Sequence, residues 1–346
     1  MCSDLSSNTS MPEQCRMKET INFGVIGCGS ISATHLAALA EMKDVRVVAV
    51  SDANASRRTN AAAKTGARAY ADYHELLADP DVDIVTILTA SGAHAAVGME
   101  AARAGKHVVV EKPLDVTVEN AQALIDCCRE KGVTLSCIFQ HRFDPAVRIL
   151  KDAVTSGRMG RINACCCHTK WYRDQNYYDC ANWRGTLKFD GGGALINQSI
   201  HYIDTMLYIM GDAEEVFGYT ATLAHERIEG EDVAMATVKF RSGALGLIEG
   251  TTSAYPGFYA RLDVHGERGS VIIEDDVIKF WSMADGTPCP QVPALNSTPH
   301  AAQLRDIVDA VRYGAAPAVT GEEALKSLAL VRAVYASARS GAPTRL

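Results

Sequence analysis

Residues 21–32 read INFGVIGCGSIS, and this stretch decides the fold class of the chain. It begins with a short apolar run, which is typical of a buried β-strand. The run ends at Gly27, and Gly29 stands just before a segment with helical spacing of apolar residues, 32–42. Glycines at these places allow a tight turn and let a ligand's phosphates approach the amides at the helix N-terminus. The stretch therefore predicts the first strand–turn–helix unit of a doubly wound α/β domain.

Outward from this unit, strand-like and helix-like segments alternate up to about residue 143. The expected strands are apolar throughout, which indicates a parallel sheet covered by helices on both faces. The further strands are expected at residues 45–52, 82–89, 107–110 and 133–139, and the helices at 32–42, 53–66, 72–77, 93–105 and 118–131. We expect a dinucleotide-binding domain over residues 21–143, preceded by a loose leader over residues 1–20.

The second half of the chain has a different pattern. A helix at 144–156 and a strand at 162–171 come before a polar, aromatic stretch at 172–190, and a helix then opens at the glycines 191–193 and runs to Met210. Strand-like runs separated by turn residues follow, which predicts an antiparallel meander. These runs span 216–223, 233–240, 244–252, 259–265 and 270–273, and helices at 300–313 and 322–340 close the chain. We expect a second α/β domain over residues 144–346, whose last helices could pack back on the first domain.

Composition narrows the classes of partner. The chain has 346 residues, enough for about two domains of roughly 150 residues each. Its net charge of −7 gives no global attraction to nucleic acid or to an anionic membrane. No apolar run reaches the roughly 18 residues of a membrane span, and the N-terminal stretch lacks the apolar core of a signal peptide. We expect no nucleic-acid partner, no membrane partner and a cytoplasmic location.

The eleven cysteines fit the same location. No two of them form a C-x-x-C pair, and three are consecutive at 165–167. Neighbours in a strand point to opposite faces, so these three cannot converge on one metal ion. We therefore expect small buried side chains in a reducing compartment, and no metal site.

Asp52 ends the second expected strand, 25 residues after Gly27. A carboxylate at this place can accept hydrogen bonds from ribose hydroxyls and would repel a 2′-phosphate, which favours NAD over NADP. Arg57 and Arg58 follow shortly and leave NADP as the less favoured alternative. The expected dinucleotide-binding residues of this unit are Gly27, Cys28, Gly29, Ser30, Ile31 and Asp52.

Two further motifs contain candidate catalytic residues. Glu111-Lys112-Pro113 directly follows a strand, and ligands of open α/β sheets bind outside the carboxyl ends of the strands, so Lys112 should point into that crevice. On the helix after the glycines 191–193, Asn197 and His201 are four residues apart and share a face, with Asp204 three residues further on. Such a stripe could hold a sugar hydroxyl, take its proton and orient the base. The alternative is a buried core histidine.

Together, Gly27-Cys28-Gly29, the Glu-Lys-Pro motif and Gly-Gly followed by His201-x-x-Asp204 resemble the Gfo/Idh/MocA oxidoreductase family, from about residue 21 to 346. The resemblance implies an N-terminal Rossmann domain, a C-terminal α/β domain with an open antiparallel sheet, a nicotinamide cofactor, and a homodimer or homotetramer formed through that sheet. It implies that Lys112 is the active-site lysine and His201 the usual acid/base, while Asn197 stands where inositol dehydrogenases have Asp. It also places these residues near the cofactor: Thr89, Ser91, His94, Glu111, Lys112, Gln140, Trp183 and Arg184.

A narrower resemblance involves the segments 171–179, 183–186 and 190–198, which are similar to UDP-N-acetylglucosaminuronate 3-dehydrogenases and to pyranoside 3-dehydrogenases. Aromatic faces bind sugar C–H surfaces and polar groups bind hydroxyls, so Tyr172, Arg173 and Tyr178 are candidate substrate residues. A packing loop is the alternative. Residues 281–300 form a short, Pro-rich segment without the aromatic-glycine stretch associated with the nucleotide-sugar enzymes, which counts against a UDP moiety.

The favoured hypothesis is NAD-dependent oxidation of a secondary hydroxyl of a pyranose sugar or glycoside, at C3, with Lys112, His201 and Asn197 as catalytic residues. Either Lys112 or His201 could be the base. The competing hypotheses are a UDP-N-acetylglucosaminuronate 3-dehydrogenase, an inositol dehydrogenase, an NAD-retaining glycoside hydrolase that works by redox elimination, and a non-catalytic dinucleotide-binding regulator.

Overall fold

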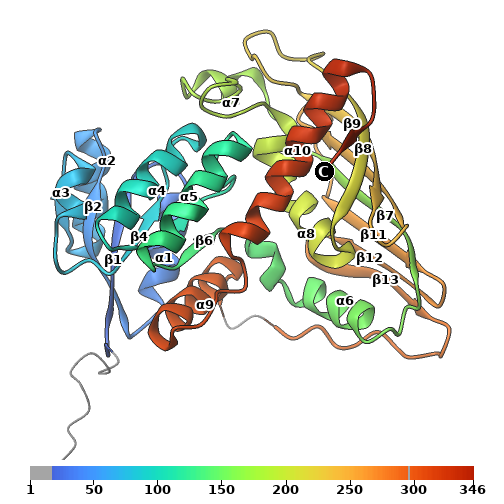
Figure 1. The fold of residues 1–346 in the computed structure, drawn as a ribbon, viewed down its shortest axis with the longest axis horizontal. Helices are drawn as coiled ribbons and strands as arrows, with labels where there is room; N and C mark the ends of the chain where they lie inside the picture. The colour runs from blue at the N-terminus through green and yellow to red at the C-terminus, as the bar shows by residue number, and fades with distance from the viewer. Residues whose placement is uncertain (1–17, 295–296) are drawn as a thin grey trace, which may run out of the picture.

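Two β-sheets organise the chain, one in each half (Figure 1). The structure is a computed structural model, and it describes residues 18–294 and 297–346. Most of the expected leader, together with Cys2 and Cys15, lies outside the described residues. The predicted boundary at residue 143 stays a prediction.

The first sheet is parallel and has six strands in the order β3-β2-β1-β4-β5-β6, as in a dinucleotide-binding Rossmann domain. Its strands are β1 Ile21–Ile26, β2 Val45–Ser51, β3 Arg68–Tyr70, β4 Ile84–Ile87, β5 His107–Val110 and β6 Leu135–Cys137. The helices between them are α1 Ser32–Ala40, α2 Ala55–Thr65, α3 Tyr73–Leu77, α4 His94–Arg103 and α5 Val118–Lys131. The predicted doubly wound architecture is confirmed. Of the strands in this sheet, only β3 was missed, because a strand of three largely exposed residues gives no apolar run.

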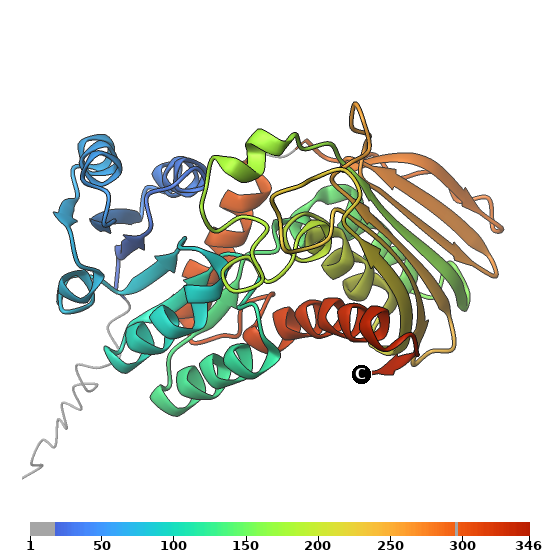
Figure 2. The ribbon, with the colours of Figure 1, turned by 90° about the horizontal axis from the view of Figure 1, so that it is seen from above.

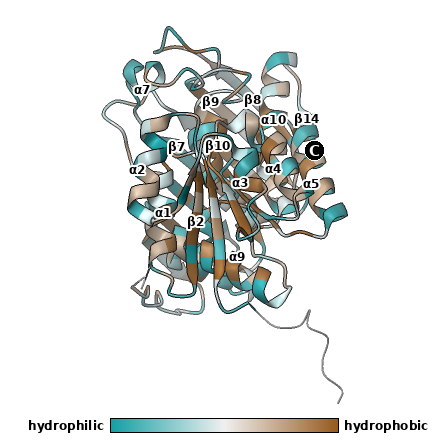
Figure 3. Cartoon of the chain, turned by 90° about the vertical axis from the view of Figure 1, so that its left-hand side faces the viewer, coloured by the Kyte–Doolittle hydropathy of each residue, from teal (hydrophilic) through white to brown (hydrophobic). Residues whose placement is uncertain are grey.

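Burial explains why these segments form a parallel sheet. The side chains of Phe23, Ile84 and Val109, on three neighbouring strands, are fully buried. In Figure 3 the strands around β2 are largely brown, while the surrounding helices carry teal on their outer faces. Strands that are apolar on both sides need a helix layer on each face, which is the arrangement that the continuous apolar runs predict.

The second sheet has eight strands in the order β13-β12-β11-β7-β10-β9-β8-β14. Its strands are β7 Ile162–Lys170, β8 Ala213–Ala221, β9 Val233–Phe240, β10 Leu245–Thr251, β11 Arg261–Gly266, β12 Gly269–Glu274, β13 Val277–Met283 and β14 Thr344–Arg345. The α/β class of this half is confirmed, and the runs β8–β9–β10 and β11–β12–β13 are antiparallel as expected, but they do not form one continuous meander. β7 lies between β11 and β10 and runs parallel to β10, so the sheet is mixed. The strand β13 was missed because most of its residues are not buried and do not alternate.

The remaining helices connect and cover the sheets. They are α6 Pro145–Thr155, α7 Gln175–Asp179, α8 Ile200–Met210, α9 Pro299–Tyr313 and α10 Gly321–Ser340, with short 3₁₀ turns η2 Ser91–Ala93 and η3 Gln140–Phe143. The long α10 packs against β8 and α8 in one half and against α5 and β6 in the other (Figures 1 and 2). α9 packs against α1 and η3. Both closing helices therefore contact the first 143 residues.

Two further expectations concern membrane-spanning helices and the state of the cysteines. Among the described residues, no helix combines the length and the apolar character that a membrane crossing requires. All nine described cysteines are free, and Cys165 and Cys167 are buried on one face of β7 while Cys166 is partly exposed. The alternation expected for the three consecutive cysteines is thus present.

Candidate active site

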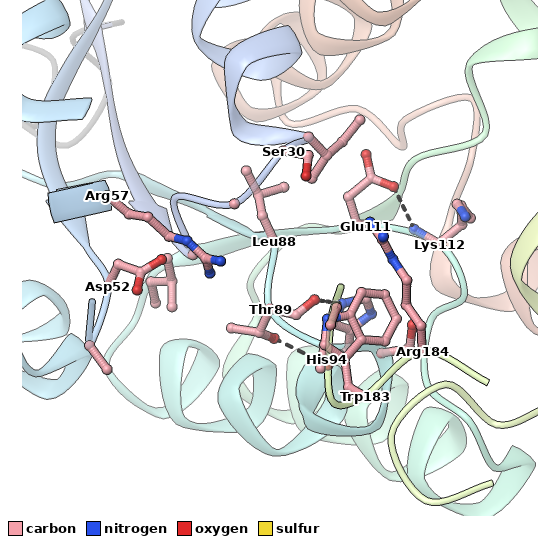
Figure 4. A pocket seen from close by; sticks show the side chains of 18 of the residues that line it. Ser30, Asp52, Arg57, Leu88, Thr89, His94, Glu111, Lys112, Trp183 and Arg184 are labelled. Carbon is pink, nitrogen blue, oxygen red and sulfur yellow. Dashed lines mark hydrogen bonds between the residues drawn. The ribbon is translucent and has the colours of Figure 1, made fainter. Parts of the chain in front are cut away.

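A cavity of about 770 Å³ lies at the carboxyl ends of the first sheet's strands and extends to the segments around α7 and α8. Figure 4 shows Asp52 and Arg57 at one end of it and Lys112 at the other. Most of the predicted site residues line this one cavity: Gly27, Gly29, Ser30, Ile31, Asp52, Thr89, Ser91, His94, Glu111, Lys112, Gln140, Trp183, Arg184, Asn197 and His201. Residues that are far apart in the sequence are thereby brought together, although the roles of the individual residues remain proposals.

The glycine turn leaves room for a phosphate-bearing ligand. Gly27 has φ +95°, and a Cβ there would come within 2.6 Å of the Leu88 carbonyl oxygen, so only glycine fits. At Gly29 a Cβ would meet no atom within 4 Å, which means that the space beside it is open. The N-terminus of α1 has no capping side chain; the Ser32 and Thr34 N–H groups donate to the carbonyl oxygens of Gly29 and Ile31, which leaves the N–H groups of the turn itself, from Gly29 to Ile31, to an anion. These features fit a dinucleotide pyrophosphate.

Asp52 is held against this turn. One carboxylate oxygen accepts the Cys28 backbone N–H at 2.8 Å, and the other accepts the Asn54 N–H at 2.7 Å. Arg58 donates to the Asp52 carbonyl oxygen at 2.6 Å, and Arg57 lines the cavity. The side chain of Cys28 does not line the cavity, because it packs in a small apolar cluster under the turn. Only its backbone belongs to the loop that would hold the cofactor.

Lys112 lies at the inner end of the cavity. Its Nζ donates to the Asn197 carbonyl oxygen at 2.6 Å and lies 3.5 Å from the Asn197 side-chain oxygen. Its backbone N–H donates to Oε2 of Glu111, whose other oxygen is 2.8 Å from Nε2 of His35. Burial lowers the pKa of Lys112, while the negative charges of Glu111 and Asp190 oppose that shift. The Lys112 ammonium is thus held by the backbone of Asn197, four residues before the candidate base His201.

His201 sits on the first turn of α8, four residues after Asn197. The continuous helix expected from 191 to 210 is in fact a π-helical turn at Ala194–Ser199 followed by α8, yet Asn197 and His201 both line the cavity. Burial lowers the pKa of His201 well below its ordinary value, and the charges of Lys112 and His141 lower it further. A neutral imidazole can accept a proton at pH 7.

Asp204 does not orient His201, and that part of the sequence hypothesis was wrong. Its carboxylate accepts two hydrogen bonds from Arg142, from Nε at 2.7 Å and from Nη2 at 2.8 Å, and both side chains are buried. A buried carboxylate on an apolar helix needs such a cation. The partner was not apparent from the sequence, because Arg142 is 62 residues away along the chain.

The amide of Asn197 is fully engaged. Its Nδ2 donates to Asp190, and its Oδ1 accepts from Gln198 Nε2 at 2.7 Å. Asp190 also accepts the Gly185 backbone N–H at 2.8 Å, and burial raises the pKa of this carboxyl group. These bonds fix the position of Asn197, and its backbone carbonyl oxygen in turn holds the Lys112 ammonium. The arrangement therefore favours a positioning role for Asn197 over a role in proton transfer.

The polar, aromatic stretch at 172–190 contributes other residues to the cavity than those expected from the sequence. The structure does not put Tyr172, Arg173 or Tyr178 among its lining residues. Tyr178 is buried with its hydroxyl 2.8 Å from Thr252 Oγ1. Its neighbour Tyr177 lines the cavity instead, with the Arg184 guanidinium 4.3 Å from its ring centroid. Tyr172 is on the surface against Tyr255, and Arg173 donates to Gln198 at 2.9 Å.

Several lining residues were missed from the sequence. His300, on the first turn of α9, lies with its ring 5.9 Å from the His35 ring, and burial lowers its pKa to about 4. No local pattern marks it, because it reaches the cavity only through the packing of α9. Tyr73, at the start of α3, also lines the cavity.

The cavity wall also contains polar atoms that lack partners. Among the described residues, no group bonds to the buried Gln140 Oε1, Arg184 Nε or His201 Nδ1. Buried polar groups are normally hydrogen-bonded, so these atoms fit a site built for a polar ligand. His94 also lines the cavity and links two of its segments, because its ring nitrogens lie 2.8 Å and 3.1 Å from the carbonyl oxygens of Pro113 and Thr89 (Figure 4).

Comparison with known proteins agrees with this arrangement. Residues 21–139 match a sequence model described as "Oxidoreductase family, NAD-binding Rossmann fold", and residues 151–346 match the C-terminal alpha/beta domain of the same family. The crystal structure of the WlbA dehydrogenase from Bordetella pertussis, in complex with NADH and UDP-GlcNAcA, is 35% identical, has a TM-score of 0.90, and the match covers 96% of this chain and 99% of that one.

Two curated relatives act on other cyclic substrates. Myo-inositol 2-dehydrogenase of Thermotoga maritima is 30% identical over 90% of this chain and 94% of its own length. Levoglucosan dehydrogenase of Pseudarthrobacter phenanthrenivorans is 29% identical over 73% of each chain.

Proposed function

The chain belongs to the Gfo/Idh/MocA family of NAD-binding oxidoreductases, and from that premise we propose that it oxidises a secondary hydroxyl of a pyranose sugar or glycoside, at C3. The observation that carries the proposal is the single cavity that joins the glycine turn to Lys112, Asn197 and His201. The similarity to a dehydrogenase crystallised with UDP-GlcNAcA supports a pyranose, and the inositol and levoglucosan relatives support a cyclic polyol more broadly.

Each catalytic side chain has a distinct task in this proposal. NAD, when bound, accepts the hydride from the substrate carbon. The turn at Gly27–Ile31 and Asp52 would hold the cofactor's pyrophosphate and ribose. The neutral His201 imidazole takes the hydroxyl proton, and the Lys112 ammonium donates a hydrogen bond to the oxygen as negative charge develops on it. Asn197 keeps Lys112 in place through its carbonyl oxygen.

The substrate class can be tested with the purified chain. It is incubated with NAD and separate glucosides, amino sugars, uronic acids, inositols and UDP-sugars, while absorbance follows the formation of NADH. The proposal predicts turnover of pyranosides, with an oxidised C3 in the product by NMR. Turnover of inositols alone would contradict it. Hydrolysis of a glycoside without accumulation of NADH would identify the redox-elimination reaction, and binding of NAD without any turnover would favour a regulator.

Asp52 should set the preference for NAD over NADP. Asp52→Asn keeps an oxygen that can accept the Cys28 N–H but removes the charge that repels a 2′-phosphate. Losing a charge-assisted hydrogen bond costs about 1.5–3 kcal/mol, so we expect the ratio of kcat/KM for NAD to that for NADP to fall about tenfold or more. Asp72→Asn, at the same end of the cavity, is the matched control and should leave the ratio nearly unchanged. An equal fall in both variants would contradict the role of Asp52.

The outer face of the second sheet is proposed as the interface of a homodimer or homotetramer. Side chains alternate along β9 and β10, and those on the outer face include exposed apolar residues: Tyr219, Met235, Leu245, Leu247 and Phe280. Exposed apolar side chains on one face of a sheet are typical of an interface. Light scattering after size exclusion should show an oligomer for the natural chain and a monomer for Leu245→Arg combined with Leu247→Arg. Leu223→Arg, in the loop after β8, is the control and should stay oligomeric; a monomeric natural chain would contradict the proposal.

A cytoplasmic location is also part of the proposal. It rests on the nine free cysteines of the described residues, five of which are buried in the apolar core around both sheets. Free thiols persist where the compartment is reducing.

A further inference from the structure

His141 occupies the short turn η3, and two carboxylates share one of its ring nitrogens. Nδ1 lies 2.6 Å from Asp144 Oδ2 and 3.2 Å from Asp276 Oδ1. Burial raises the pKa of Asp144 to about 6, so at pH 7 both carboxylates are ionised and only accept hydrogen bonds, and Nδ1 then holds a proton. Two negative groups at this distance favour the doubly protonated, positively charged ring. The side chains of His141 and Asp144 are largely buried, so solvent screens this pair little, whereas Asp276 is 39% exposed.

The second carboxylate stands in the two-residue hairpin loop between β12 and β13. Asp275 and Asp276, at the β12–β13 turn, have φ of +40° and +68°, and they are the non-glycine residues with positive φ in the described part of the chain. The Asp275 carboxylate accepts the Ala260 N–H at 3.0 Å, which anchors the turn. A two-residue hairpin loop of this kind requires positive φ at both residues, and Asp is among the non-glycine residues that tolerate it. Here it brings Asp276 from the far hairpin to His141.

The charged ring faces the candidate base. The centroids of the His141 and His201 rings are 5.6 Å apart and the rings are nearly perpendicular, at 87°. The other titratable groups that influence His201 are Lys112, after β5, and His300, on α9. On its other sides His141 meets Asp144, Asp276 and the ring of Tyr202, whose centroid is 5.1 Å away. A positive ring at this distance opposes the addition of a second proton to His201.

We propose that His141, clamped between Asp144 and Asp276, is a positioning residue that holds a positive charge beside His201 and keeps the His201 imidazole unprotonated until substrate binds. The proposal rests on the proposed function for its catalytic meaning. The state of the two histidines, however, can be measured without any substrate.

The experiment is a titration of the full-length chain with ¹⁵N-labelled histidines, followed by NMR, with His201→Asn and His141→Gln used for assignment. In the natural chain His141 should stay charged up to about pH 10, because the two carboxylates raise its pKa although burial opposes this. His201 should stay neutral well below pH 6.5. Titration of His141 below pH 7 would overturn the proposal, and this measurement needs no variant to fold.

Two variants separate the charge from mere packing. His141→Gln removes the positive ring and should raise the pKa of His201 by about one unit or more. Asp276→Asn leaves Asp144 to hold the His141 proton, so it should not raise the pKa of His201. No rise in His141→Gln, or an equal rise in Asp276→Asn as from loosened packing, would overturn the proposal. Dialysis against EDTA should leave both values unchanged, and a change would show that the cluster binds a cation instead.

Kinetics provide a second readout once a substrate is known. The acid limb of kcat/KM reports the base of the free enzyme, so in His141→Gln it should move to higher pH by the same amount as the NMR value. An unmoved limb beside a shifted NMR value would overturn the catalytic part of the proposal. If no sugar is oxidised at all, the proposed function fails, whereas the NMR result on the two histidines still stands or falls by itself.

Discussion

Replacing Lys112 with methionine is expected to lower kcat by about 10²–10³-fold, the usual cost of removing a group that stabilises a developing oxyanion. The Lys112 ammonium lies at the inner end of the cavity on a half-buried side chain, and its Nζ is fixed on the Asn197 carbonyl oxygen at 2.6 Å. Methionine has a similar length and no charge, so it removes the donor while it fills much of the space. Stopped-flow measurement of NADH formation with saturating NAD and sugar gives the rate.

The chain contains a matched control for this variant. Lys106, just before β5, is buried, and its Nζ likewise donates to backbone carbonyl oxygens, those of Asp79 at 2.8 Å and Val82 at 2.9 Å. It does not line the cavity. Lys106→Met should therefore keep kcat within a few fold, even if it lowers thermal stability. Comparable losses of kcat in both variants would show that the effect comes from leaving backbone carbonyl oxygens without a donor, and not from the position of Lys112 in the cavity.

Replacing His201 with alanine is expected to lower kcat by about 10² or more, because general-base catalysis contributes roughly 10²–10⁴-fold. Burial lowers the pKa of His201, so the imidazole is already neutral at pH 7 and its task is to take the hydroxyl proton. The variant should also lose the acid limb of kcat/KM that reports this group. Added imidazole should restore part of the rate, since the cavity beside Lys112 and Asn197 would be left open.

The same variant decides which residue is the base. If Lys112 takes the proton, His201→Ala should keep the acid limb and Lys112→Met should lose it. The control is His168→Ala on β7, which removes an imidazole paired with Glu249 at 2.8 Å and lies outside the cavity. It should leave both kcat and the pH profile unchanged. Near-normal turnover in His201→Ala would refute the assignment of His201 to proton transfer.

Much of the site could be predicted because its motifs depend on short-range geometry. Gly27 lies at a turn that only glycine can make, Asp52 follows a strand that pairs with β1, and Lys112 follows another strand whose carboxyl end opens on the same crevice. The spacing of Asn197 and His201 brought both to the cavity even across a π-helical turn. Each of these predictions needed only the period of one element or the rule for strand ends in a parallel sheet.

Other features could not be predicted, because their partners are far away along the chain. Tyr177 and Tyr178 are neighbours of the same type, and only the packing of α7 decides that Tyr177 faces the cavity while Tyr178 is buried against Thr252. Asp204 was expected to orient His201 and instead pairs with Arg142.

By itself, the sequence determined the class of each half, the strand–turn–helix unit that would hold a dinucleotide, and the residue types that could take a proton from a hydroxyl group. It did so because periodicity, turns and strand ends are local properties of the chain. Only the tertiary structure decided that β7 enters the second sheet beside β10, that α9 brings His300 to the cavity, and that Asp144 and Asp276 meet at His141. These contacts follow from how the two halves pack, and burial then sets the charge of each group that they bring together.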